Sequence, residues 1–200
     1  MTRDRASFST GTLCNASSEV MALDSRIRPL IAGRRIAGPA QTARIVPGQN
    51  AAVHHAVASA RPGDVLVVDG GGSERFGPFG DLLAEACLHR GLAAAVFDCT
   101  IRDSADITDM GFQVFGRGFH PESTAKADPG EIDVPVTVGG VVVHPGDHIV
   151  GDDDGVVVLP KDIADGVFET AERVLEREER IRRRIQSGET TVDIFDLGRP

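Results

Sequence analysis

Two uninterrupted apolar segments, each preceded by a helical segment, most strongly constrain the fold of this 200-residue chain. In residues 50–60, "NAAVHHAVASA", apolar residues recur at helical intervals. The segment "VLVVDGGG" follows at residues 65–72 and predicts a buried strand that runs into a free glycine turn after Asp69. A second helical pattern begins at Asp81, and the apolar run "AAAVF" at residues 93–97 follows it. Two helix–strand units in succession predict a layered α/β core with parallel strand pairing.

The flanking segments have a different character. Residues 134–160, "VPVTVGGVVVHPGDHIVGDDDGVVVLP", are Val-rich runs separated by turn signals, which predicts antiparallel hairpins. Residues 161–187 predict a long, highly charged helix with apolar residues mostly on one face and a stop at Gly188. Such a helix packs along a neighbouring subunit or across the surface. No linker or internal repeat divides the chain, so we expect one domain over residues 1–200.

The N-terminal quarter has weaker signals. We expect a short helix that ends before Asp24, followed by strand pieces around Ile36 and residues 43–46.

Composition limits the partners and the compartment. The net charge of −9 argues against a nucleic acid or an anionic membrane as the main partner, because both would repel this surface. The chain has no apolar run near the roughly 20 residues that cross a bilayer. The three cysteines are scattered without metal-binding or disulfide spacing, and the charged N-terminus lacks a signal-peptide core. We therefore expect a cytoplasmic location.

The start of the second helix offers an anion-binding site. Gly80-Asp81 opens the helix, and the backbone N–H groups of its first turn lack acceptors within the helix. A small carboxylate or phosphate suits such a position. The alternative is that Asp81 serves only as a helix N-cap, as most such Asp residues do.

The end of the following strand carries a charged pair. Arg102-Asp103 follows the strand at its carboxyl end, where open α/β sheets bind ligands. Arg102 offers a permanently charged fork for a carboxylate or an enolate oxygen. Asp103 and Asp81 are hard oxygen donors suited to Mg²⁺. The alternative is a surface ion pair at a strand end.

These residues carry a resemblance to a known family. Asp81, twenty intervening residues and then Arg102-Asp103 form a D-x20-R-D pattern, with "VLVVDGGGS" before it and "DMGFQVFGRGFHPEST" after it. The sequence resembles the 4-hydroxy-4-methyl-2-oxoglutarate aldolases, class II pyruvate aldolases that share their fold with the regulator of ribonuclease E activity A. The resemblance spans residues 9–188; Asn15 stands where the family commonly has Asp. It implies an α/β/β/α swivelling-type domain with a mixed sheet and a long C-terminal helix.

The resemblance also implies roles for individual residues. Arg102 would bind the substrate and act in catalysis with Asp81, Asp103 would bind the metal directly, and Asp81 would hold a metal-bound water. The loop that would bind the pyruvyl carboxylate through backbone amides consists of Gly80, Asp81, Leu82 and Leu83. Family members form trimers or paired trimers with the active site between subunits, and the acid contributed by the neighbouring helix would be Glu178.

The reaction implied is retro-aldol cleavage of a 4-hydroxy-2-oxo acid to pyruvate and a second oxo acid, with Mg²⁺ or Mn²⁺ as Lewis acid. Decarboxylation of oxaloacetate should accompany it. A metal-bound water is the expected proton shuttle, because no histidine or lysine is evidently placed for this role. The alternative is a non-catalytic binding protein that inhibits a ribonuclease. A methyltransferase would need a glycine-rich cofactor loop that this sequence lacks.

Four other features are given structural interpretations. His54-His55 should be surface residues, because adjacent helical side chains diverge. Asp98 should orient Arg102 as a neighbour of the site. Residues 151–155, "GDDDG", predict a hairpin turn rather than a calcium loop. Cys99 has no sequence neighbour that would lower its thiol pKa.

Overall fold

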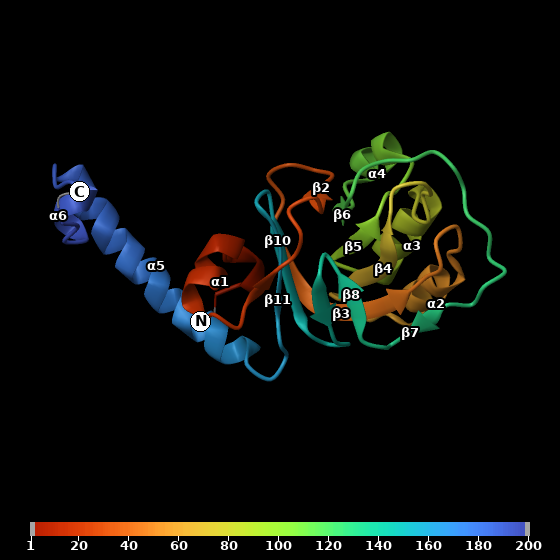
Figure 1. The fold of residues 1–200 in the computed structure, drawn as a ribbon, viewed down its shortest axis with the longest axis horizontal. Helices are drawn as coiled ribbons and strands as arrows, with labels where there is room; N and C mark the ends of the chain where they lie inside the picture. Colours follow the sequence, from red (N-terminus) through yellow and green to blue (C-terminus); the bar gives the residue numbers. More distant parts are fainter. Residues whose placement is uncertain (1–2, 199–200) are drawn as a thin grey trace.

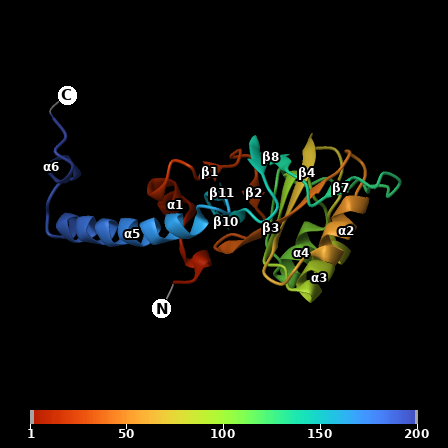
Figure 2. The same cartoon turned by 90° about the horizontal axis from the view of Figure 1, so that it is seen from below.

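The computed structural model describes residues 3–198, which form four layers (Figures 1 and 2). Three helices cover one face of a parallel sheet, antiparallel strands cover its other face, and two further helices cover those strands. The helices are η1 (Arg5–Ser7), α1 (Thr10–Ala16), α2 (Ala51–Ser59), α3 (Asp81–Arg90), α4 (Ser104–Met110), α5 (Ala164–Gln186) and α6 (Thr191–Ile194). This arrangement confirms the predicted mixed α/β fold with a long C-terminal helix.

Parallel strands form the centre of the main sheet. They are β3 (Ile36–Arg44), β4 (Val65–Ser73), β5 (Ala94–Cys99) and β6 (Val114–Gly116), paired in that order. Leu66 and Val68 pack toward helices α2 and α3, whereas Val65 and Val67 pack toward the antiparallel layer. Successive side chains of a strand point to opposite faces of the sheet. Because both faces of this sheet are buried, its central strands need uninterrupted apolar runs. The parallel pairing predicted from the sequence is confirmed.

Antiparallel strands extend and cover this sheet. The full order is β1-β11-β10-β3-β4-β5-β6-β2, with β7 paired to β3, and β8-β9 forms a separate hairpin. The bounds of these strands are β1 (Met21–Ala22), β2 (Arg28–Pro29), β7 (Glu131–Ile132), β8 (Val136–Val138), β9 (Val141–Val143), β10 (His148–Asp152) and β11 (Gly155–Leu159). Both Val-rich hairpins are confirmed, and the GDDDG segment forms the turn between β10 and β11.

The short N-terminal helix is confirmed, since α1 ends at Ala16, before Asp24. Two other local predictions differ from the structure. The expected strand pieces near Ile36 are one nine-residue strand, β3, whose first half pairs with β10 and whose second half pairs with β4. The glycines after Asp69 belong to β4 instead of a free turn. Gly71 and Gly72 adopt positive φ angles there, where the register with β5 shifts.

Helix α5 leaves the body of the molecule. Its first turns bury Ala164, Val167, Phe168 and Ala171 against η1, α1 and the β10–β11 layer, and the rest projects outward (Figure 1). It ends where predicted, with Gly188 at φ +98°. Helix α6, which the sequence did not predict, follows. Within residues 3–198, no helix combines the length and apolar character that crossing a bilayer requires.

Candidate active site

The start of α3 and the end of β5 lie together, although twenty residues separate Asp81 from Arg102. The Arg102 amide donates to the Phe79 carbonyl at 2.9 Å. The Asp81 amide donates to Asp103 Oδ2 at 3.3 Å, and Arg102 Nε lies 3.3 Å from the same oxygen. Because α3 runs back along the sheet into β5, the two loops meet at the carboxyl edge of the parallel strands. The structure therefore brings residues 80–83, Arg102 and Asp103 into one place. Glu178 lies in helix α5, away from this edge of its own chain.

A sharp backbone turn aims Asp103 at the start of α3. Asp103 adopts a left-handed conformation, with φ 55° and ψ 38°, between β5 and α4. Asp is among the few side chains that visit this region, and non-glycine residues that do so are concentrated at functional sites. The turn directs the carboxylate back across the sheet edge toward Gly80 and Asp81.

Two glycines provide the space that the charged pair occupies. A Cβ atom on Gly80 would overlap Asp103 Oδ2 and lie 3.0 Å from Arg102 Nε. A Cβ atom on Gly77 would lie 2.8 Å from Arg102 Cβ and 2.7 Å from the His120 carbonyl oxygen. Real Cβ contacts are not that short, so the "GPFG" loop must carry glycine at both ends for Arg102 and Asp103 to sit where they do.

The helix cap differs from the predicted one. Gly80 is the N-cap of α3, and Asp81 is the first helical residue and makes no capping bond. Asp103, from another element, accepts the Asp81 amide instead. The amides of Leu82 and Leu83 have no acceptor among residues 3–198. The N-cap interpretation of Asp81 is thus wrong, while the free amides expected beside it are present.

These groups line a cavity of about 150 Å³. Its wall consists of Asn50, His54, Gly77, Pro78, Gly80, Asp81, Leu82, Leu83, Arg102, Ser123, Thr124 and Lys126. Asp103 contacts that wall through Gly80 and Arg102. The cavity has the size of a small organic acid rather than of a nucleotide.

One wall of the cavity was missed in the sequence. It comprises Asn50 and His54 around the start of α2, and Ser123, Thr124 and Lys126 from the loop after β6. His54 is exposed, as predicted, but it faces the site. The sequence shows no histidine or lysine evidently placed as the proton shuttle; the structure adds His54 and Lys126 to the cavity wall, because loop pairing brings residues 123–126 next to α2.

Asn50 is the most unusual member of this wall. It is 7% exposed, and its Nδ2 donates to the Pro78 carbonyl at 3.0 Å. Because a carbonyl only accepts, this bond fixes the amide orientation and leaves Oδ1 as an acceptor. That oxygen is buried without a hydrogen-bond partner. Buried acceptors are nearly always satisfied, so an orphan beside a cavity marks a position where a bound molecule or water belongs.

Burial and nearby charge lower the pKa of His54. Desolvation of its imidazolium contributes most, followed by the positive charges of Lys126 and His55. His54 is therefore neutral at physiological pH and offers one donor and one acceptor to the cavity.

Two other predicted neighbours have structural roles. Asp98 does not orient Arg102: its Oδ1 accepts from Arg117 Nε, and its Oδ2 accepts from the Gly139 amide at 3.1 Å. Strand alternation is the reason, since Asp98 points from β5 toward the antiparallel layer. Cys99 is 1% exposed, and burial raises the pKa of its thiol well above the ordinary value. Such a thiol is inert, as the sequence predicted.

The donor set fits a hard divalent cation. Asp103 and Asp81 provide carboxylate oxygens near the free α3 amides. Nowhere in residues 3–198 do three or more His, Cys, Asp or Glu side chains gather as a metal cluster. Mg²⁺ commonly uses one or two protein carboxylates and takes its remaining ligands from water and substrate, so this sparse set suits it better than Zn²⁺.

Comparisons with known proteins identify relatives of this chain. A protein of Halalkalibacterium halodurans named "Putative 4-hydroxy-4-methyl-2-oxoglutarate aldolase" is 37% identical over 164 residues, covering 82% of this chain and 78% of that protein. A solved structure from Geobacillus kaustophilus, described as an S-adenosylmethionine:2-dimethylmenaquinone methyltransferase, is 36% identical with a TM-score of 0.73 and covers 79% and 98% of the two chains. Streptomyces coelicolor RraAS2, described as an unusual member of the RNase ES inhibitor RraA protein family, is 30% identical with a TM-score of 0.79 and covers 90% and 94%.

A family model identifies the family. The family model described as Aldolase/RraA covers residues 10–158, which include both cavity walls and all of the parallel strands. The chain belongs to the RraA-like, aldolase/RraA family.

Proposed function

We propose that this protein is a divalent-metal-dependent lyase. It cleaves 4-hydroxy-4-methyl-2-oxoglutarate and related 4-hydroxy-2-oxo acids to pyruvate and a second oxo acid. One observation carries the proposal: Arg102, Asp81 and the free amides of Leu82 and Leu83 line one cavity, with Asp103 held against its wall. A ribonuclease inhibitor has no need of such a cavity.

The residues of this chain divide the work of binding and cleavage. The Leu82 and Leu83 amides at the α3 N-terminus donate to the substrate's C1 carboxylate. Arg102 donates to the C2 oxygen, where negative charge develops as the C3–C4 bond breaks. Asp81 holds the water through which the proton of the 4-hydroxyl leaves. The bonding pair of C3–C4 passes into the enolate of pyruvate, C4 becomes the carbonyl of the second oxo acid, and a proton returned to C3 completes pyruvate.

Asp103, with Asp81 nearby, would hold the cation, either Mg²⁺ or Mn²⁺. When bound, it supplies Lewis-acid polarisation of the 2-oxo group. Arg102 Nε lies 3.3 Å from the Asp103 carboxylate. The permanent positive charge of Arg102 would therefore lie beside the metal ion and act on the same 2-oxo oxygen.

The same arrangement supports decarboxylation of oxaloacetate. In that substrate the C3–C4 bond also breaks toward C2, and CO₂ leaves in place of an oxo acid. Arg102 meets the same developing enolate oxygen in both reactions. We therefore propose oxaloacetate decarboxylase activity alongside aldol cleavage.

A coupled assay tests the proposal. The protein is incubated with 4-hydroxy-4-methyl-2-oxoglutarate or oxaloacetate and Mg²⁺, and pyruvate is followed with lactate dehydrogenase. Pyruvate should form only with the metal, and Asp103→Ala should reduce its formation to the rate of Mg²⁺ alone. Decay of oxaloacetate no faster than with free Mg²⁺, together with no aldol cleavage, would exclude the lyase.

The similarity to RraAS2 favours one other candidate, a non-catalytic protein that binds and inhibits a ribonuclease. Fold alone does not separate the two, since one fold hosts many functions. Inhibition of ribonuclease E that persists in Asp103→Ala, without pyruvate formation by the unmodified protein, would favour this candidate.

We also propose a homotrimer or homohexamer. The outer part of α5 and the segment after it expose four large apolar side chains, Ile185, Val192, Phe195 and Leu197. Exposed apolar residues grouped on a projecting arm are typical of association surfaces. In such an assembly Glu178 of α5 would reach the cavity of a neighbouring subunit.

A further inference from the structure

A second cavity, of about 170 Å³, lies at the edge of the main sheet where β2 pairs with β6. Its wall comes from β2, from β6 and from the segments that follow β2, β5 and β6. Ligands of open α/β sheets bind at the carboxyl ends of strands, and Arg117 follows β6 much as Arg102 follows β5. No described residue lines both this cavity and the candidate active site. The second cavity is therefore a separate place on the molecule.

Arg117 brings a guanidinium with unused donors to this wall. Its side chain is 7% exposed, its Nε donates to Asp98 Oδ1, and its Nη1 donates to Asp24 Oδ2 at 3.5 Å. Its Nη2 makes no hydrogen bond among residues 3–198. Two carboxylates thus fix the orientation of the guanidinium, although an arginine this buried normally uses more of its donors. An anion in the cavity would accept from the donors that remain.

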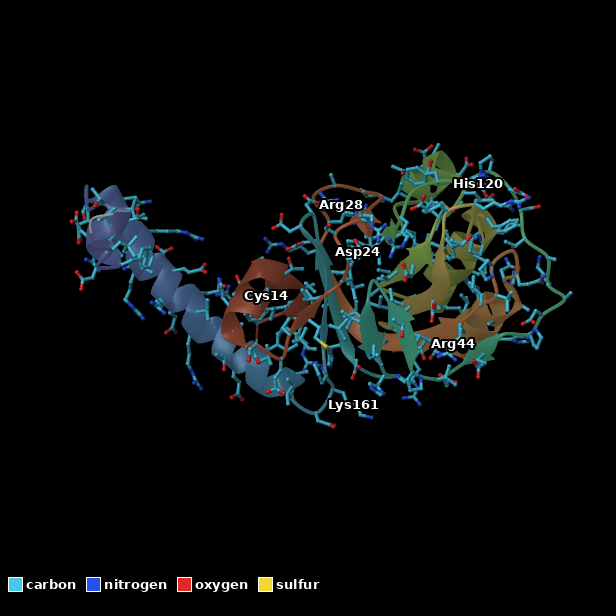
Figure 3. The ribbon with its side chains drawn as sticks, viewed as in Figure 1. Cys14, Asp24, Arg28, Arg44, His120 and Lys161 are labelled. Atoms are coloured by element: carbon cyan, nitrogen blue, oxygen red, sulfur yellow. The ribbon has the colours of Figure 1, made fainter. Side chains whose placement is uncertain are left out.

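Arg28 adds a second guanidinium with free donors. It is exposed on β2, on the same side of the molecule as Asp24 (Figure 3), and donates only to the Asp154 carbonyl, at 3.4 Å. It has no carboxylate within ion-pair distance among residues 3–198. Arg26 also lines the cavity, but Asp24 binds it through Nε and Nη2. The three arginines thus share two carboxylates, and a positive charge remains at this wall of a protein whose net charge is −9.

The remainder of the wall is largely apolar. Ile101 and Val114, both at most 1% exposed, lie in it beside Leu30. Phe119 adds an aromatic residue that is 59% exposed. An exposed aromatic residue on its own needs no explanation, but this one adjoins guanidinium groups with free donors. A flat apolar group packs well against an aromatic ring, and a guanidinium binds a carboxylate in its own plane.

We infer that this cavity is a second ligand site, which takes a monocarboxylate with an aromatic body. The carboxylate accepts from Arg28 and from Arg117 Nη2, and the ring packs against Phe119. Among the described residues that line the cavity, none is acidic, so the cavity lacks a metal ligand of the kind that Asp103 offers in the candidate active site. The inference does not rest on the proposed lyase, because the ligand contacts none of the residues that the cleavage uses.

The backbone just after β5 forms the partition between the two cavities. The Ile101 amide donates to the Gly118 carbonyl at 3.0 Å, and the Ile101 carbonyl accepts from the His120 amide at 2.9 Å. Ile101 and Gly118 line the second cavity, whereas Arg102, the next residue after Ile101, lines the first. Because these backbone bonds hold a wall between them, both cavities can be occupied at the same time.

Calorimetry with three probes tests the chemistry of the ligand. Benzoate has both the ring and the carboxylate, benzamide has the ring without the charge, and acetate has the charge without the ring. The unmodified protein should bind benzoate at least about tenfold more tightly than either, since a charge-assisted hydrogen bond and a buried ring each contribute about that factor. Phe119→Ala should remove most of the preference for benzoate over acetate.

Paired arginine substitutions locate the site. Arg28→Met should weaken benzoate binding at least about tenfold, because a charge-assisted hydrogen bond is lost. Arg35→Met is the matched control: Arg35 is also exposed and donates to a backbone carbonyl, that of Ser7 at 2.8 Å, but lies outside the cavity. Arg35→Met and Arg102→Ala should both bind benzoate as the unmodified protein does. Saturating pyruvate with Mg²⁺ should leave the benzoate affinity unchanged.

Each possible failure removes a stated part of the inference. Equal binding of benzoate and benzamide would show that the arginines do not select an anion, and acetate bound as tightly as benzoate would exclude the aromatic body. Benzoate binding that survives Arg28→Met but is lost in Arg102→Ala would place benzoate in the candidate active site. Any of these results, or no benzoate binding by the folded protein, overturns the inference. A protein that forms no pyruvate but binds benzoate through Arg28 would overturn the lyase alone.

Discussion

The sheet edge that carries the candidate site and the C-terminal arm, the outer part of α5 with the segment after it, are built in opposite ways. At the sheet edge, Arg102 and Asp103 are held by backbone bonds to the start of α3 and by the space beside Gly80. Along the outer part of α5, side-chain contacts are ion pairs within the helix, such as Glu178–Arg182 at 3.7 Å and Glu179–Arg183 at 3.3 Å. Exposed pairs of this kind contribute roughly 0.3–0.5 kcal/mol each.

This difference separates the residues that determine the chemistry of the site from those that determine assembly. The geometry around Arg102 and Asp103 is fixed inside one chain, so substitutions there should change the proposed chemistry and leave folding and assembly intact. The outer part of the arm lies outside the buried core clusters, and its large apolar residues are exposed. Substitutions there should change assembly and leave the fold intact.

Removing the guanidinium gives the largest expected effect. Arg102→Ala should lower kcat by about 10²–10³, because one oxyanion donor typically supplies about 3–4 kcal/mol of transition-state stabilisation. The melting temperature and the oligomeric state should not change. Steady-state kinetics with oxaloacetate, thermal melting and size-exclusion chromatography check this. A variant that falls apart into monomers would show that the edge also supports assembly, and the contrast with the arm would fail.

A single methyl group gives the next test. In Gly80→Ala the new Cβ would overlap the Asp103 carboxylate, so Asp103 must move. We expect activity to fall at least about tenfold, since misplacement of a catalytic group by about 1 Å lowers the rate on the order of 10²-fold. The Mg²⁺ concentration that gives half-maximal activity should rise. Gly166→Ala is the matched control, because a Cβ there meets no atom within 4 Å. Retained activity in Gly80→Ala would show that Asp103 does not depend on that glycine.

Some of this site was predictable from the sequence for a physical reason. Asp81, Arg102 and Asp103 belong to one helix–strand unit, and such a unit returns its strand end to the side of the sheet where its helix began. Strand alternation was equally visible, but it was not applied to Asp98, which points to the opposite face from Phe97 and Cys99. Residue periodicity and the connection between helix and strand therefore predicted the part of the site whose residues are close in sequence.

The other half depended on loop pairing. Lys126 reaches the cavity because Ala125 pairs with Gly48 and Asn50, a contact across about 75 residues that no periodic pattern encodes. Asn50 was visible as a polar residue before a helix, but its orphan Oδ1 follows from the bond to Pro78. The glycine requirement at Gly80 likewise depends on where Asp103 lies, and not on the φ angle of Gly80 itself.

Mixed oligomers test whether Glu178 of the arm acts at the site of a neighbouring subunit. If Glu178 acts in the neighbouring subunit, Glu178→Gln should lower kcat at least about tenfold, within the range for general acid–base groups. Co-expression of Glu178→Gln with Arg102→Ala should restore roughly a quarter of the normal activity, because random closed oligomers pair an intact Arg102 with an intact Glu178 at that frequency. Activity no higher than the average of the two variants, in oligomers shown to be mixed, would place Glu178 outside the site.

The smallest expected effect concerns the base of the arm at moderately acidic pH. His148 lies beside Arg5, with its Nε2 2.6 Å from Arg5 Nη1, and edge-on to the Phe168 ring. Its pKa is lowered from the ordinary value of 6.5 by burial and then by the charge of Arg5, against smaller opposing effects of Asp165 and Asp147. The unfolded chain therefore binds a proton at this histidine more readily than the folded chain. Stability that is fully present above pH 6.5 should decline as the pH falls below that value.

The decline is assigned by substitution. His148→Gln should flatten the dependence of the unfolding free energy on pH between about 6.5 and 5, above the range in which carboxylates titrate. His54 has a lowered pKa too, so His54→Gln should flatten it by a separate amount. Denaturant titrations at several pH values measure both slopes. Because His148 anchors the N-terminal segment under α5 while the site lies on the other side of the sheet, His148→Gln should leave pyruvate proton exchange unchanged. A loss of exchange in that variant would show that the arm and the sheet edge are coupled within one chain.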